Sequence, residues 1–161
     1  MTWRGQSSPP DRIFSALVYL LPMIRALPLG IGVLTAIPAL GQIILLAIGP
    51  FLRLYTTLSA AIPLFELLVF FALYLGVVRN YRCSNFLRYN VMQSLLIGIV
   101  ISIVGIVTNL LGLDNTLLGE TLYTFTFFVA FGASVYSLVR SATGLFPELP
   151  MISDAAYQYI R

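Results

Sequence analysis

Four long apolar segments constrain this chain more than any other feature of its sequence. They cover residues 29–48, 58–78, 91–111 and 122–139. A helix rises about 1.5 Å per residue, so about 20 apolar residues cross the roughly 30 Å hydrocarbon core of a bilayer. The pattern predicts an all-α integral membrane protein with four transmembrane helices, organised as a single membrane domain over residues 1–161.

The composition supports this prediction, because the chain has too few charges to cover a surface in water. Charged residues make up 9% of the chain, whereas a soluble domain carries about 25%. The nine arginines are too dispersed to form a nucleic-acid surface. Histidine is absent and Cys83 is the single cysteine. We therefore predict a protein without enzymatic activity, metal or cofactor.

The segment at residues 12–25 differs from the four long ones. Its apolar part holds twelve residues between Arg12 and Arg25, which is too short to cross a bilayer. Apolar residues recur in it at helical spacing, so we expect an amphipathic helix at the membrane interface with its arginines in water. Arginine follows the run where a signal peptide has a small-residue cleavage site, which disfavours a signal peptide.

The arginines predict the orientation of the chain. With four spans, eight of the nine arginines fall on one side of the membrane, and Arg53 falls on the other. Arg79, Arg82 and Arg88 lie together between the second and third segments, where they set the topology. Because cytoplasmic loops collect arginine and lysine, we expect both termini, including a tail at residues 145–161, on the cytoplasmic or stromal side.

The third segment carries polar and small residues at every third or fourth position, which places them on one face of a helix. Lipid cannot satisfy amides and hydroxyls, so this face contacts either protein or a water-filled path. Close helix packing is the favoured interpretation, with Ser134 of the fourth segment as the hypothesised contact, and the path stays open. The residues are Asn90, Gln93, Ser94, Gly98, Ser102, Gly105 and Asn109.

Two further residues stand out within the predicted spans. Glu66 is the one acid inside any of them, and carboxylates inside a membrane are candidates for a functional role. Pro38 lies in the first span, where it is expected to kink the helix.

Four stretches in order carry a resemblance to a known family. They are RIFSALVYLLPMI (12–24), FFALYLGVVRN (70–80), FLRYNVMQSLL (86–96) and PMISDAAYQ (150–158). Together they resemble the twenty-kilodalton subunit family of the chloroplast inner-envelope protein translocon, the TIC complex. The resemblance implies four transmembrane helices and a location in the chloroplast inner envelope or a cyanobacterial membrane. Because we find no plant-type transit sequence, we expect a cyanobacterial or plastid-encoded member.

The resemblance also implies a function. We expect a non-enzymatic core or channel-forming subunit of a membrane protein-translocation complex. Its partners would be other translocon subunits, precursor polypeptides and the lipid bilayer, with a homo-oligomer left open. Two alternatives also stay open: a small-molecule or ion transporter or channel, and an assembly factor for membrane complexes.

Overall fold

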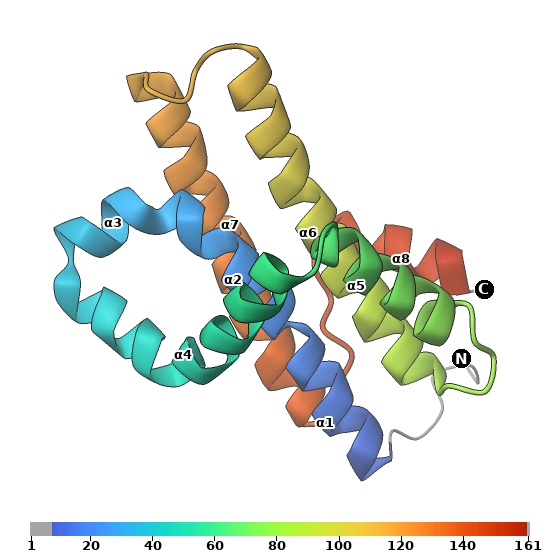
Figure 1. Ribbon diagram of the computed structural model, residues 1–161. Coiled ribbons are helices and arrows are strands. Elements are labelled where there is room, and N and C mark those ends of the chain that lie inside the picture. The colour runs from blue at the N-terminus through green and yellow to red at the C-terminus, as the bar shows by residue number, and fades with distance from the viewer. Residues whose placement is uncertain (1–7, 161) are drawn as a thin grey trace.

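Helices joined by turns and loops make up the part of the chain that the structure, a computed structural model, describes, residues 8–160 (Figure 1). No strand occurs in this range. The elements are the α-helices α1 (Pro9–Val18), α2 (Leu20–Ala26), α3 (Ile31–Ala36), α4 (Pro38–Ala61), α5 (Phe65–Leu73), α6 (Asn85–Leu110), α7 (Leu117–Ala142) and α8 (Ile152–Ile160), with the 3₁₀-helix η1 (Leu27–Gly30) and the π-helix η2 (Tyr74–Val78).

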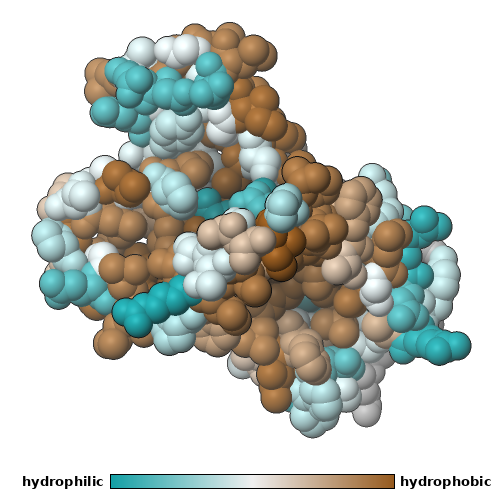
Figure 2. Space-filling view, viewed as in Figure 1, coloured by the Kyte–Doolittle hydropathy of each residue, from teal (hydrophilic) through white to brown (hydrophobic). Residues whose placement is uncertain are grey.

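The expected fold class is confirmed. Four helical stretches in the described residues are long and apolar enough to cross a membrane, namely Pro9–Ala36, Pro38–Ala61, Asn85–Leu110 and Leu117–Ala142. A shorter apolar helix covers Phe65–Val78. Apolar residues cover most of the visible surface, and hydrophilic residues gather at the loop between α6 and α7 and at the right-hand edge (Figure 2). Such a surface suits a bilayer.

Prolines divide the first two predicted spans differently from the sequence-based boundaries. Pro38 starts a new helix at a break in residues 29–48, because a residue before proline is disfavoured in the α conformation. Ile37 accordingly has φ −125° and ψ 79°. The segment 58–78 is interrupted between Ala61 and Phe65, around Pro63. Pro38 therefore separates two helices, where the sequence predicted a kink within one.

The N-terminal apolar helix is present, but it does not stop near residue 25. A capping box starts it: Ser8 Oγ accepts a hydrogen bond from the Asp11 amide, and the Asp11 carboxylate accepts one from the Ser8 amide. Helical structure then continues to Ala36 with η1 as a tighter stretch. By length and composition the whole stretch Pro9–Ala36 is long enough to cross a membrane. The interfacial location expected for residues 12–25 stays a prediction.

The side of this helix that packs inward carries polar side chains. Ser15 and Tyr19 are fully buried, whereas Ile13 and Phe14 are each 61% exposed. Small and polar residues thus contact the protein, and large apolar residues face outward. This arrangement is typical of a helix surrounded by lipid, in which close contacts form through small residues.

The helices form a bundle with α1 and α2 packed against both α6 and α7. The starts of α1 and α6 and the end of α7 lie toward one end, opposite the loop that joins α6 to α7 (Figure 1). The α3–α4 segment curves away from this bundle, and α5 with η2 returns to it beside α6. The large side chains buried at its centre are Tyr19, Phe86, Tyr89, Ile97 and Phe127.

A glycine permits the close packing of η1 on α7. A Cβ atom added to Gly30 would lie 2.5 Å from Cδ2 of Phe127, whose side chain is 2% exposed. We expect Gly30→Ala to destabilise the protein by about 1–3 kcal/mol, because the buried ring has to move. Gly32→Ala is the matched control, since nothing lies within 4 Å of an added Cβ there. Thermal unfolding in detergent measures both; equal melting temperatures would contradict this packing.

Candidate functional site

Two polar clusters lie inside the bundle, and the first is centred on the amides of α6. The Tyr19 hydroxyl is 2.9 Å from Asn90 Oδ1 and 2.7 Å from Gln93 Oε1. Ser141 Oγ of α7 donates to Asn90 Oδ1 at 2.6 Å. Tyr19, Asn90, Gln93 and Ser141 are all fully buried. The cluster therefore links Tyr19, at the junction of α1 and α2, to α6 and α7 through buried hydrogen bonds.

The same cluster fastens the C-terminal segment. Gln93 Nε2 donates to the Pro147 carbonyl at 3.2 Å and to Ser153 Oγ at 3.1 Å. The Tyr89 hydroxyl also donates to the Pro147 carbonyl, at 2.7 Å. The rings of Tyr89 and Tyr157 stack with centroids 4.6 Å apart. The tail expected at residues 145–161 is thus docked on α6 as far as the structure describes it, through residue 160.

The remaining predicted stripe residues lie in different surroundings along α6. Ser94 Oγ donates to the Val18 carbonyl at 2.9 Å, and Gly98 lies against Arg25. Ser102 accepts a hydrogen bond from Arg25, so it contacts α2 and not Ser134 of α7. Gly105 has no atom within 4 Å of an added Cβ. Exposed Asn109 donates to Asp114 Oδ2 at 2.8 Å beside the loop to α7.

The second cluster is an ion pair between Arg25 of α2 and Glu66 of α5, at the side of the bundle that α4 approaches. Arg25 Nη2 lies 3.0 Å from Glu66 Oε2 and 2.7 Å from Ser102 Oγ. The Tyr55 hydroxyl donates to Glu66 Oε1 at 3.0 Å. Gly98 makes room for the guanidinium, because an added Cβ would lie 2.9 Å from Arg25 Nη1. Four elements, α2, α4, α5 and α6, therefore meet at one pair of opposite charges.

The ion pair borders an apolar cavity of about 700 Å³. The cavity lies between η1, α3 and α4, on the inner side of the curve that α3 and α4 make in Figure 1. Apolar residues form most of its wall, and Arg25, Tyr55 and Glu66 contribute polar groups. Isolated charges inside a membrane are costly, so a pair facing a cavity is the strongest functional candidate in the chain.

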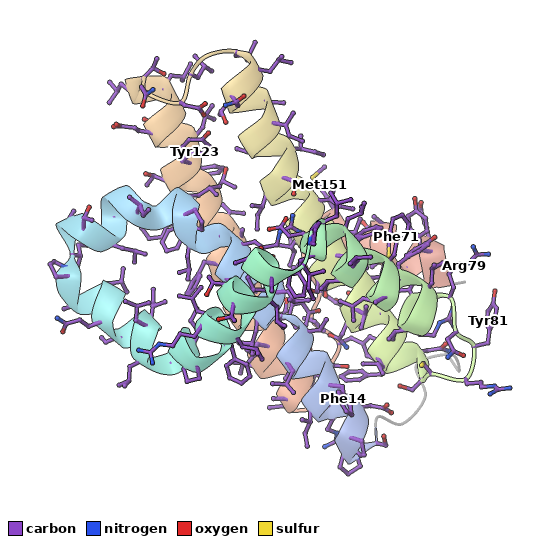
Figure 3. All side chains as sticks on the ribbon, in the orientation of Figure 1. Phe14, Phe71, Arg79, Tyr81, Tyr123 and Met151 are labelled. Atoms are coloured by element: carbon purple, nitrogen blue, oxygen red, sulfur yellow. The ribbon has the colours of Figure 1, made fainter. Side chains whose placement is uncertain are left out.

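Arg79, Arg82 and Arg88 do not form a uniform charged loop. Arg79 and Arg82 are exposed between η2 and α6, where Figure 3 labels Arg79 and Tyr81. Arg88 is 5% exposed; its Nε donates to the Val78 carbonyl at 2.8 Å, and its guanidinium lies 4.9 Å from the Tyr81 ring centre. Arg88 thus contributes a positive charge and also connects the end of η2 to α6 by a hydrogen bond.

Sequence reasoning missed three contributors to these clusters. Arg25 was expected to point to water but pairs with Glu66, so that expectation is wrong. Tyr19 and Tyr55 were not singled out, although each donates to a predicted site residue. A usable signal was the presence of one arginine and one glutamate within apolar helices, since such charges pair with each other.

No group of three or more histidine, cysteine, aspartate or glutamate side chains is placed to hold a metal ion within residues 8–160.

Comparison with known proteins decides the family. The model of a family described as "Chloroplast import apparatus Tic20-like" matches residues 8–156. The chain belongs to the Tic20-like family.

Members of the Tic20 family from two kinds of organism are similar to the chain. A "Tic20 family protein" of Synechocystis sp. is 40% identical over 154 residues, 94% of this chain and 93% of that protein. "Protein TIC 20-II, chloroplastic" of Arabidopsis thaliana is 30% identical over 164 residues, 97% of this chain and 76% of that protein. "Protein TIC 20-v, chloroplastic", also of Arabidopsis thaliana, is 27% identical over 149 residues, which are 91% of this chain and 69% of that protein.

The family and the helices together establish a multi-pass membrane protein of a plastid envelope or a cyanobacterial membrane. They also associate the chain with protein import.

Proposed function

We propose that this chain is a non-enzymatic core or channel-forming subunit of a membrane protein-translocation complex. The observation that carries the proposal is the Tic20-like family match over residues 8–156. The buried polar cluster around Asn90 and Gln93 supports a packing role for that part of α6, because its groups bond to other helices of the same chain. One chain with so few spans makes a poor polypeptide conduit, so other subunits or copies complete it.

The surface of α4 leaves room for partners. Only 11% of its most apolar 18-residue stretch is buried inside the chain, compared with 50% of the corresponding stretch of α6. Ile43, Leu46 and Leu54 of α4 are 66%, 86% and 60% exposed. Large apolar side chains of this kind can face lipid as well as another helix, so this surface leaves α4 open to further contacts in the membrane. We propose other translocon subunits, with passing precursor polypeptides, as the partners.

Affinity purification tests the proposed function. The chain, tagged at its C-terminus, is purified gently from its native membranes, and co-purifying proteins are identified by mass spectrometry. A second multi-pass protein with the same tag is the control. Recovery of other membrane subunits together with precursor polypeptides, absent from the control, would support translocation. Recovery of the chain alone would contradict it.

A small-molecule or ion transporter is the second candidate, and the cavity beside Arg25 and Glu66 favours it. Liposomes that contain only this protein distinguish the two functions. Solute or ion flux that Glu66→Gln abolishes would support transport; flux equal to protein-free liposomes would reject it. An assembly factor would bring subunits without precursors in the purification above.

We also propose that the end of the bundle with the starts of α1 and α6 faces the cytoplasm or stroma. Arg12, Arg88 and Arg140 lie in helices at that end, and Arg79 and Arg82 lie in the connection that leads into α6. Loops on the cytoplasmic side of a membrane collect arginine and lysine. Two arginines of the sequence-based count, Arg4 and Arg161, lie outside the described residues. Arg25 lies within the bundle.

Cys83 provides a direct test of this orientation, because it is the single cysteine and lies between Arg82 and α6. We expect a membrane-impermeant maleimide to label Cys83 in inside-out vesicles and not in intact cells. A Cys83→Ser, Asn115→Cys variant, which moves the cysteine to the opposite loop, should show the reverse pattern. Labelling of Cys83 from outside intact cells would reverse the proposed orientation.

A further inference from the structure

We propose that the cavity between η1, α3 and α4 binds the acyl chain of one bilayer lipid, with the uncharged polar part of that lipid beside Arg25, Tyr55 and Glu66. The proposal goes beyond the proposed function and does not rest on it. The cavity of about 700 Å³ falls within the range of about 300–1,000 Å³ typical of small-molecule sites, which are mostly apolar with a few placed polar groups. Its apolar wall includes Leu27, Ile31, Leu34, Ile44, Leu45 and Leu52.

The wall favours an acyl chain over an extended polypeptide. Every peptide group in an extended segment needs hydrogen-bond partners, and lipid supplies none. In the corner of the cavity wall, Arg25, Tyr55 and Glu66 already bond to one another. Thr35 and Thr56 bond to backbone carbonyls of their own helices, and Gln42 contributes one amide. An acyl chain has no polar groups to satisfy, so it fits the apolar part without that cost.

The volume disfavours a crossing helix as the occupant. A helix about 10–12 Å wide that rises about 1.5 Å per residue would fill 700 Å³ with about four to six residues. This is at most about one and a half turns, whereas a span needs about 20 residues. The cavity therefore accommodates one small amphipathic molecule better than a membrane-spanning segment.

The charges at the corner favour an uncharged lipid. Arg25 and Glu66 neutralise each other at 3.0 Å, and Tyr55 bonds to the second carboxylate oxygen. An anionic headgroup would compete with Glu66 for Arg25 and repel the carboxylate. Hydroxyl or ester groups can instead donate to Glu66 or accept from Arg25 without disturbing the pair.

Lipid retention in detergent tests the site. The full chain is reconstituted into vesicles with equal amounts of phosphatidylcholine, phosphatidylglycerol and a neutral glycosyl diacylglycerol, extracted into mild detergent and measured by native mass spectrometry. We expect about one retained lipid per chain, with the glycosyl diacylglycerol enriched over phosphatidylglycerol. Loosely surrounding lipids are lost on extraction, so retention reports an enclosed site.

Two neighbouring leucines of α4 provide matched variants. Leu45 lines the cavity, whereas Leu46 is 86% exposed and is not part of its wall. Leu45→Trp should reduce retention about tenfold, because the indole displaces at least two methylenes, and Leu46→Trp should leave retention unchanged. Melting temperatures within a few degrees of the original chain show that both variants fold. Equal retention by the two variants would overturn the proposal.

Glu66→Gln tests the role of charge at the corner. It leaves Arg25 without its counter-ion, so the retained lipid should shift toward phosphatidylglycerol by about tenfold, consistent with a new charge-assisted contact. An unchanged lipid ratio would reject the assignment of the polar corner. A photo-crosslinker at Leu45 that captures a polypeptide in native membranes, in place of lipid, would overturn the proposal as a whole.

Discussion

Replacing Arg25 by leucine is expected to lower the free energy of unfolding by about 2–3 kcal/mol. The change leaves the Glu66 carboxylate, which lies half exposed at the cavity among apolar helices, without the guanidinium 3.0 Å away. An unpaired charge in a transmembrane helix costs about 2.5–3.5 kcal/mol, and the Tyr55 hydroxyl still offsets part of it. Thermal unfolding in detergent should show a melting temperature lower by about 5–10 °C.

The double variant Arg25→Leu, Glu66→Leu separates the charge effect from lost packing. Removing both charges should return stability to within about 1 kcal/mol of the original chain, because no unpaired charge then remains among the apolar helices. Arg25→Lys keeps the charge but loses the planar geometry that reaches both Glu66 and Ser102, so its loss should be smaller. If the double variant is as unstable as Arg25→Leu alone, the pair does not act as described.

The second large effect is expected for Gln93→Leu. Leucine removes the Oε1 acceptor of the Tyr19 hydroxyl and the Nε2 donor to the Pro147 carbonyl and Ser153. The Tyr19 hydroxyl keeps Asn90 Oδ1, and the Pro147 carbonyl keeps the Tyr89 hydroxyl. The variant loses hydrogen bonds without leaving these groups bare, so we expect a loss of about 1–2 kcal/mol. The tail should also detach more often, since Gln93 contacts it directly.

Limited chymotrypsin digestion measures the tail separately from global stability. A loss of about 1.4 kcal/mol in docking raises the detached fraction about tenfold, so cleavage after residue 145 should accelerate to a similar extent. Asn109→Leu on the same helix is the matched control, because Asn109 is exposed and its amide bonds to Asp114 away from the tail. Equal cleavage rates for both variants would contradict the role of Gln93.

The stabilising clusters and the proposed lipid site make separate demands on the fold. The Asn90–Gln93 cluster lies where α1, α6 and α7 meet, and its groups bond within the chain. The ion pair lies where the loosely packed α4 meets the bundle. Rigid packing at the first and a cavity at the second are consistent with a subunit whose α4 contacts other molecules of the membrane.

The sequence by itself determined the membrane class and the helical content, because bilayers accept only structures that satisfy their own backbone groups. It also determined that Asn90, Gln93 and Ser94 share one face of a helix, since that follows from helical period alone. Helix boundaries were less accurate near Pro38 and Pro63, where long apolar runs conceal the breaks. Hydropathy is averaged over many residues, so it does not locate the single residue at which a helix ends within an apolar run.

Tertiary structure decided which groups meet. Arg25 and Glu66 are 41 positions apart, and Tyr19 is 71 positions from Asn90; no local pattern specifies such pairs. The direction in which α1 packs was also decided there. In a membrane the large apolar side chains gain nothing from turning inward, so Ser15 and Tyr19 face the protein while Ile13 and Phe14 face lipid.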